Sequence, residues 1–108
     1  MKSKARRGRR VRFLSIYEIK SLHSGKVYIG SSKDTLLRWN SHIYDLVTFK
    51  HCSKELLKEY KSLGVSNFTF RILLLIPIDK ATNIRKIEQD FLNNYKKEVL
   101  FNTRRATN

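Results

Sequence analysis

The stretch 13–30 reads FLSIYEIKSLHSGKVYIG, and it decides the fold. Phe13–Lys20 and Lys26–Gly30 are rich in β-branched and aromatic residues, a composition typical of β-strands. Between them, Ser21–Gly25 have the length of a hairpin loop and end in a glycine, which can adopt an unusual backbone angle. The sequence therefore predicts an antiparallel hairpin at the start of the folded part.

The predicted hairpin register sets two tyrosines beside each other. If Lys20 lies opposite Gly25, Tyr17 falls opposite Tyr28 on one face of the sheet. Taken alone, such a pair is most often a structural cross-strand contact that a helix half covers. The alternative is a pair of hydroxyl groups that serve a reaction, and residues elsewhere in the chain must decide between the two.

Two helices are expected after the hairpin. Asp34 or Ser32 can cap the first helix, which runs to about residue 47. Ser53 can cap the second, and Gly64 stands where a left-handed helix stop is expected. The apolar stripe expected to face inward from the first helix consists of Leu36, Trp39, Ile43, Leu46 and Val47.

A third strand and a last helix complete the expected fold. Residues 68–76 are apolar at nearly every position after Arg71, which favours the central strand of a sheet covered on both faces, and Pro77 ends that run. A last helix is expected over about residues 80–97, followed by a short edge strand or return segment at 100–102. The fold class is therefore α/β in the α+β sense: a small three-stranded antiparallel sheet flanked by about three helices.

The composition fits one domain and indicates an anionic partner. The 108 residues suffice for one hydrophobic core, and 23 Lys and Arg against 9 Asp and Glu give a net charge of +14. Nucleic acid is the first partner expected of such a surplus, and an anionic membrane surface is the second. The twelve residues 1–12 carry seven basic residues and no acid, so we expect a flexible basic arm there and a folded domain over 13–108.

Basic side chains in both parts are candidates for contacts with DNA phosphates. A solubilising or targeting tail and an ordinary solvated surface are the alternative explanations for the same charges. The expected phosphate contacts are Arg6, Arg7, Arg9, Arg10, Arg12, Lys26, Lys33 and Lys50.

The chain lacks the sequence features of membrane and secreted proteins. No apolar run approaches the roughly 20 residues that a membrane helix needs. The amino end has no apolar segment behind its positive charges, as a secretory signal would. The single cysteine, Cys52, allows no internal disulfide. We therefore expect an intracellular protein with no membrane partner.

One acidic residue stands on the apolar side of the last predicted helix. Glu88 has Ile84, Phe91 and Leu92 as its helical neighbours, so its carboxylate emerges from the apolar face. A carboxylate withdrawn from water without a partner would take up a proton. We therefore expect a cation beside Glu88, either a Lys or Arg in an ordinary ion pair or a divalent metal ion such as Mg²⁺, which prefers oxygen ligands.

Two triplets in the hairpin carry a resemblance to a known family. Ser15-Ile16-Tyr17 and, ten residues later, Tyr28-Ile29-Gly30 resemble the paired strands that name the GIY-YIG nuclease family. Ser15 replaces the first glycine of the family pattern, and we expect this departure to alter packing rather than chemistry.

The rest of the chain keeps the order of that family over about residues 14–102. The sequence is most similar to the catalytic domain of phage intron homing endonucleases, which have a similar Arg-Trp-x-x-His helix and a similar loop with a histidine. The residues that fall where the family pattern requires them are Arg38, His42, His51, Glu88 and Asn102.

The resemblance implies a metal-dependent endonuclease that hydrolyses phosphodiester bonds of DNA, by nicking or by double-strand cleavage. It implies Mg²⁺ as the cofactor, with Mn²⁺ as a substitute, and Glu88 as the metal ligand. Tyr17 would act as general base or position the attacking water, although an ordinary phenol has a pKa near 10. Arg38 would supply positive charge beside Tyr17 and grip phosphate oxygens.

The remaining implied catalytic residues assist those three. Tyr28 and His42 would complete a hydrogen-bond relay to the water, and His42 is the second candidate for the base because its ordinary pKa lies nearer neutrality. Asn102 would orient a neighbour or the backbone near the metal. His51 would aid catalysis or binding.

Two other classes of function stay open at this stage. The first is a catalytically inactive, basic DNA- or RNA-binding module, and the intact residue set argues against it. The second is a small RNA-binding or ribosome-associated protein, which has no reason to place Glu88 on an apolar face. The resemblance further implies a phage-encoded protein in the cytoplasm or nucleoid of a host cell, working as a monomer or a transient dimer on DNA, with a separate specificity domain or a partner protein.

Overall fold

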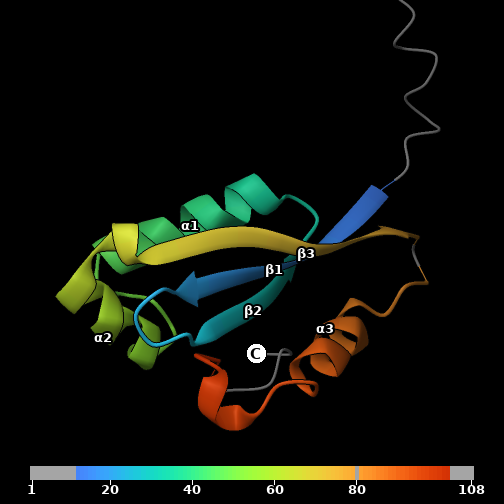
Figure 1. Cartoon of the computed structure of the whole chain (residues 1–108). Coiled ribbons are helices and arrows are strands. Elements are labelled where there is room, and N and C mark those ends of the chain that lie inside the picture. Colours follow the sequence, from blue (N-terminus) through green and yellow to red (C-terminus); the bar gives the residue numbers. More distant parts are fainter. Residues whose placement is uncertain (1–11, 80, 103–108) are drawn as a thin grey trace, which may run out of the picture.

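The computed structural model describes residues 12–79 and 81–102. Its strands form one antiparallel sheet in the order β2-β1-β3 (Figure 1). This confirms the predicted α+β fold of a three-stranded sheet with three helices. The elements are β1 (Arg12–Ser21), β2 (Val27–Ser32), α1 (Thr35–Val47), α2 (Lys54–Leu63), β3 (Phe68–Ile78) and α3 (Ile84–Leu92), with 3₁₀ turns η2 (Val65–Asn67) and η3 (Lys97–Val99).

The predicted basic arm lies almost entirely outside the described residues. Arg12 is the one arm residue that the structure describes, and it opens β1, one residue before the expected start of the folded domain. The predicted phosphate contacts that lie outside the described residues are Arg6, Arg7, Arg9 and Arg10.

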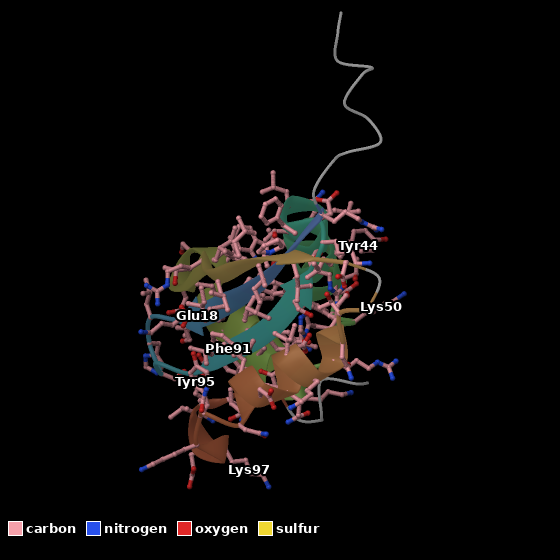
Figure 2. The ribbon with its side chains drawn as sticks, turned by 90° about the vertical axis from the view of Figure 1, so that its right-hand side faces the viewer. Glu18, Tyr44, Lys50, Phe91, Tyr95 and Lys97 are labelled. Carbon is pink, nitrogen blue, oxygen red and sulfur yellow. The ribbon has the colours of Figure 1, made fainter. Side chains whose placement is uncertain are left out.

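The sheet separates two hydrophobic clusters. Side chains of β1 alternate between its faces, so Leu14 and Ile16 belong to one cluster while Tyr17 and Ile19, beyond a bulge against β3, belong to the other. Helices α1 and α2 cover the Tyr17 face, and α3 covers the opposite face with Phe91 and other apolar residues (Figures 1 and 2). No helix among the described residues has the length and apolarity to span a bilayer.

The prediction that the third strand is central was wrong, because β1 takes that place. β3 pairs only with β1 and forms an edge of the sheet, where Ile72, Leu74 and Leu75 remain exposed. Pro77 does not end the strand, which continues to Ile78. An edge strand tolerates proline because one side of its backbone has no strand partner to donate to.

The predicted hairpin register was wrong by two residues. Lys20 pairs with Val27, so Tyr17 lies opposite Gly30 and Tyr28 lies opposite Ile19. The Ser21 amide donates to the Lys26 carbonyl at 2.9 Å, so the loop comprises residues 22–25 and begins one residue later than a Lys20–Gly25 pairing would give. Because side chains alternate with a period of two, this shift leaves both tyrosines on the same face as diagonal neighbours.

Gly30 is the residue that makes room for Tyr17. A Cβ built on Gly30 would overlap the hydroxyl end of the Tyr17 ring and would lie 2.9 Å from its Cε1 atom. Atoms this close must move apart, and the buried ring has little freedom to do so. The final glycine of the Tyr28-Ile29-Gly30 triplet therefore lets the Tyr17 ring lie directly across the neighbouring strand.

We expect Gly30→Ala to lower the free energy of unfolding by about 1–3 kcal/mol, the usual cost of overpacking a filled core. Chemical denaturation measures this change, and Lys20→Ala, at an exposed position on β1, is the matched control. Wild-type stability of Gly30→Ala would show that the Tyr17 ring moves aside at little cost.

The face that helix α1 turns to the core matches its predicted apolar stripe only in part, since Leu46 is buried and Trp39 packs against the core as expected. Its buried residues are His42 and Leu46, while Leu36 of the predicted inward stripe is 76% exposed and Val47 is also exposed. The buried face is thus the one that follows His42, because the imidazole finds hydrogen-bond partners inside the protein. The predicted cap at Asp34 is confirmed, since its side chain accepts from the Leu37 amide at 3.2 Å.

The ends of α2 agree with expectation, whereas the last helix is shorter than predicted. Ser53 caps α2, and Gly64 follows it at a φ of 80°, as predicted. α3 is shorter than the predicted 80–97, because Asn83 caps its start and the chain leaves the helix after Leu92. The return segment after η3 is confirmed as a single parallel bridge between Leu100 and Val27.

Candidate active site

The site is built around the Tyr17 ring on the central strand. Tyr17 is 1% exposed and packs edge-on against Trp39 of α1, with ring centroids 6.1 Å apart. Its hydroxyl oxygen lies 2.8 Å from Nε2 of His42, which also comes from α1. The central strand and the first helix therefore fix both the ring and the hydroxyl of Tyr17.

A second histidine extends this contact into a buried chain of hydrogen bonds. Nδ1 of His42 lies 2.7 Å from Nε2 of His51, and the Ser53 amide donates to Nδ1 of His51 at 3.0 Å. His42 and His51 are 2% and 3% exposed, and their rings stack with centroids 4.9 Å apart. Burial, with smaller contributions from His51 and Arg38, lowers the pKa of His42 to about 3, and burial also lowers the pKa of His51. Both rings are therefore neutral near pH 7.

Tyr28 lies beside this relay without joining its hydrogen bonds. Its ring centroid is 5.0 Å from that of His42 and 5.5 Å from that of His51, both in edge contacts. Its hydroxyl lies 3.8 Å from the sulfur of Cys52. Burial raises the pKa of Tyr28, and the neighbouring Cys52 adds to that rise. The relay from Tyr17 thus passes through His42 to His51 rather than through Tyr28.

Arg38 is the cation that acts on every ionisable group of the site. Burial raises the pKa of Tyr17 to about 12, while the charge and a hydrogen bond of Arg38 oppose that rise. Arg38 also opposes the raised pKa of Glu88. The same guanidinium contributes to the pKa shifts of Tyr28, His42 and His51. Because Arg38 itself is exposed, its positive charge lies at the solvent side of the site.

Glu88 reaches the same region from α3 on the other face of the sheet. Its carboxylate is half-buried and accepts a hydrogen bond from the Ser31 hydroxyl at the end of β2. Burial raises the pKa of Glu88, and its charge in turn contributes to the raised pKa of Tyr17. The ion pairs formed by the described residues do not involve Glu88, so the ordinary Lys or Arg partner considered for it is not present among them.

The donor set around Glu88 fits a hard divalent cation with few protein ligands. Within residues 12–79 and 81–102 no three His, Cys, Asp or Glu side chains cluster as a metal cage would require. Glu88 and Ser31 instead offer a carboxylate and a hydroxyl oxygen, at a half-buried position where the carboxylate charge lacks an ion-pair partner among the described residues. Mg²⁺ often binds proteins through one or two carboxylates and completes its shell with water and phosphate oxygens.

Asn102 organises the backbone between Tyr28 and Gly30. Its side-chain amide donates to the Ile29 carbonyl at 2.9 Å, and its side-chain oxygen accepts from the Ile29 amide at 2.9 Å. The neighbouring Phe101 carbonyl accepts from the Ser53 hydroxyl at 2.7 Å. Asn102 therefore holds β2 and the C-terminal segment together.

The described basic residues predicted to touch DNA differ in their surroundings. Arg12 and Lys33 line one pocket of about 340 Å³. Lys50 is exposed beyond the end of α1 (Figure 2). Lys26 forms an ion pair with Glu55, so its charge is partly neutralised.

Two contributors to the site escape the sequence pattern. Ser31 follows the Tyr28-Ile29-Gly30 triplet and donates a hydrogen bond to Glu88. Its place on the strand face opposite to Gly30 could have predicted that it faces the last helix. Ser53 was predicted only as a helix cap, yet its backbone amide also binds His51. A backbone donor leaves no trace in residue identity, so sequence reasoning had no means to find it.

The comparisons with known proteins place this arrangement in a family. The family model described as the GIY-YIG catalytic domain matches residues 13–104, and the chain therefore belongs to the GIY-YIG family. It is 40% identical over 71 residues to intron-associated endonuclease 1 of Enterobacteria phage T4, and this match covers 66% of the chain and 29% of the relative. The chain thus spans less than a third of that curated relative.

Two solved structures have the same fold. The homing endonuclease I-TevI catalytic domain superposes with a TM-score of 0.73 at 32% identity, over 84% of this chain and 98% of that one. A mutant of the I-TevI catalytic domain gives a TM-score of 0.75 at 33% identity, over 86% of this chain and 96% of that one. GIY-YIG nucleases generally use divalent metal ions.

Proposed function

We propose that the chain is an endonuclease that hydrolyses phosphodiester bonds of DNA in a reaction that depends on a divalent metal ion. The observation that carries the proposal is the shared action of Arg38 on Tyr17 and Glu88, which lie on different elements and on opposite faces of the sheet. A hydroxyl, a carboxylate and a guanidinium that influence one another electrostatically are the groups that phosphate hydrolysis requires. An inactive binding module has no need of such an arrangement.

Tyr17 and Arg38 perform the parts of the reaction assigned to side chains. The Tyr17 hydroxyl orients the attacking water and, when ionised, accepts its proton. Arg38 opposes the rise in the pKa of Tyr17 and binds phosphate oxygens with its planar set of donors, which stabilises the negative charge that builds on phosphorus. His42 holds the buried side of the Tyr17 hydroxyl through Nε2 at 2.8 Å, and the Tyr28 ring packs against His42.

Glu88, with the Ser31 hydroxyl, would hold Mg²⁺, for which Mn²⁺ can substitute. When bound, the ion supplies Lewis-acid chemistry by polarising the phosphate and stabilising the leaving 3′ oxygen. The half-buried position of Glu88 strengthens its attraction to a cation because burial disfavours the isolated carboxylate charge. This accounts for the raised pKa of Glu88 without an ion-pair partner among the described residues.

The proposed substrate is duplex DNA, bound through the exposed basic side chains. Arg12, Lys33 and Lys50 are the described candidates for phosphate contacts, and such contacts position DNA without reading its sequence. Sequence preference would then come from a separate specificity domain or a partner protein. One site cuts one strand, so we propose a monomer that nicks, with double-strand cleavage requiring a second copy or a second binding event.

A plasmid assay tests the function directly. We expect supercoiled plasmid to become nicked or linear in Mg²⁺ or Mn²⁺ and to stay supercoiled in EDTA, while DNA binding persists in both conditions. Catalytically dead protein that still binds DNA would instead support the binding-module alternative. Cleavage at full rate in EDTA would remove the metal ion from the reaction.

A further inference from the structure

The buried relay that ends at Tyr17 has only one donor whose direction is fixed by covalent structure. A backbone N–H can donate a hydrogen bond and cannot accept one. The Ser53 amide donates to Nδ1 of His51 at 3.0 Å, so this ring nitrogen carries no proton. A neutral imidazole has one protonated nitrogen. The proton of neutral His51 is therefore on Nε2, which faces His42.

The tautomer of His51 in turn fixes the direction of the hydrogen bonds of His42. Nε2 of His51 donates to Nδ1 of His42 across 2.7 Å, so Nδ1 of His42 is the acceptor and the proton of neutral His42 lies on Nε2. Nε2 of His42 faces the Tyr17 hydroxyl oxygen at 2.8 Å. The hydroxyl must accept this bond, and its own proton then points away from the relay.

We infer that the Ser53 amide and His51 set the tautomer of His42 so that His42 donates to the Tyr17 oxygen and never accepts its proton. The inference rests on the proposed function only for its consequence in catalysis. In that setting His42 stabilises an ionised Tyr17, and the second candidate role of His42 as the base is excluded. His51 is a positioning residue, because it acts on the reacting hydroxyl through His42.

Burial makes the arrangement stable. His42, His51 and Tyr17 are each at most 3% exposed, so water cannot supply alternative partners to the ring nitrogens. The Ser53 amide is itself fixed, since the Ser53 hydroxyl donates to the Phe101 carbonyl at 2.7 Å and accepts from the Leu56 amide at 3.2 Å. Reversing the relay would set two N–H groups against each other at Nδ1 of His51, which a dry interior does not tolerate.

Nitrogen-15 NMR of histidine side chains in the whole chain tests the inference without any activity measurement. We expect His42 and His51 to show a protonated Nε2 and an unprotonated Nδ1 at neutral pH. The exposed His23 provides an internal reference that averages over both tautomers. A protonated Nδ1 on either His42 or His51 would overturn the inference, whether or not the protein cleaves DNA.

Two substitutions at residue 51 separate hydrogen-bond direction from packing. His51→Gln can still accept from Ser53 through its carbonyl and donate to His42 through its amide, so we expect the same His42 tautomer and near wild-type kcat. His51→Met keeps the volume without the donor, and we expect mixed His42 tautomers and kcat lowered about tenfold or more at unchanged KM. Equal loss in His51→Gln and His51→Met would contradict a role in direction and favour a packing role, and His23→Gln is the surface control.

Discussion

Replacing Glu88 with glutamine should reduce plasmid cleavage by about a thousandfold or more while leaving the fold intact. The amide keeps the size of the side chain and an oxygen that can accept from Ser31, but it removes the negative charge. A metal ligand of this kind contributes several kcal/mol to the transition state, and each 1.4 kcal/mol is about tenfold in rate. Initial rates of nicking at saturating Mg²⁺ measure the loss.

The stability of the same variant provides an independent check. Because burial raises the pKa of Glu88, the folded protein disfavours the carboxylate charge, and neutral glutamine should unfold at an equal or higher temperature. Mn²⁺ binding followed by electron paramagnetic resonance should weaken in parallel with cleavage. Asp90→Asn is the matched control on the same helix, since Asp90 is exposed and pairs only with Lys86 among the described ion pairs. Metal-dependent cleavage at wild-type rate in Glu88→Gln would refute the metal assignment.

Tyr17→Phe should lower the cleavage rate by about 10²–10⁴, the range that a positioned acid or base contributes. The variant retains the ring that packs against Trp39 and removes only the hydroxyl. DNA affinity should stay near wild type, because the hydroxyl is buried and bonded to His42 rather than placed among the exposed basic side chains. Rates under single-turnover conditions and affinity from gel shifts in Ca²⁺ separate the two effects.

Tyr17→Phe should also lower the free energy of unfolding. His42 loses the acceptor of its Nε2 proton in a dry interior, which costs about 1–3 kcal/mol. Tyr44→Phe is the control, because it removes the same hydroxyl group from a tyrosine that lies on the helix of His42 and is exposed to solvent (Figure 2). Undiminished cleavage by Tyr17→Phe would show that the Tyr17 hydroxyl takes no part in the reaction. Arg38 and the metal ion proposed at Glu88 would then suffice for cleavage.

The elements that sequence patterns predicted well are those set by local chemistry. The hairpin, the cap residues Asp34 and Ser53 and the stop at Gly64 each follow from interactions within a few residues. The strand order escaped prediction because an apolar run reads the same in a central strand and in an edge strand such as β3. Two-residue errors of register preserve the face of every side chain, so the pairing of Tyr17 with Gly30 left no contradiction in the pattern.

Sequence reasoning selected residues that lie close together in the structure, but it did not predict the hydrogen bonds that join them. Tyr17, His42 and Glu88 could be chosen from the family pattern and from the misplaced acid in α3. The rotation of α1, which buries His42 and exposes Leu36, depends on a partner nine residues further along the chain. Apolar periodicity ranks leucine above histidine for the core, and the hydrogen bonds of His42 to Tyr17 and His51 reverse that ranking.

The clamp between Asn102 and Ile29 joins residues 73 positions apart, and this has a consequence for how the protein matures. A growing chain leaves the ribosome from its amino end, so β2 is synthesised long before the residue that ties it down. Closing so long a loop is slow compared with forming a hairpin or a helix. The nascent polypeptide therefore fastens β2 to the segment that contains Asn102 last, and the residues around Tyr17 and Tyr28 are fixed in place only after nearly all of the domain has been made.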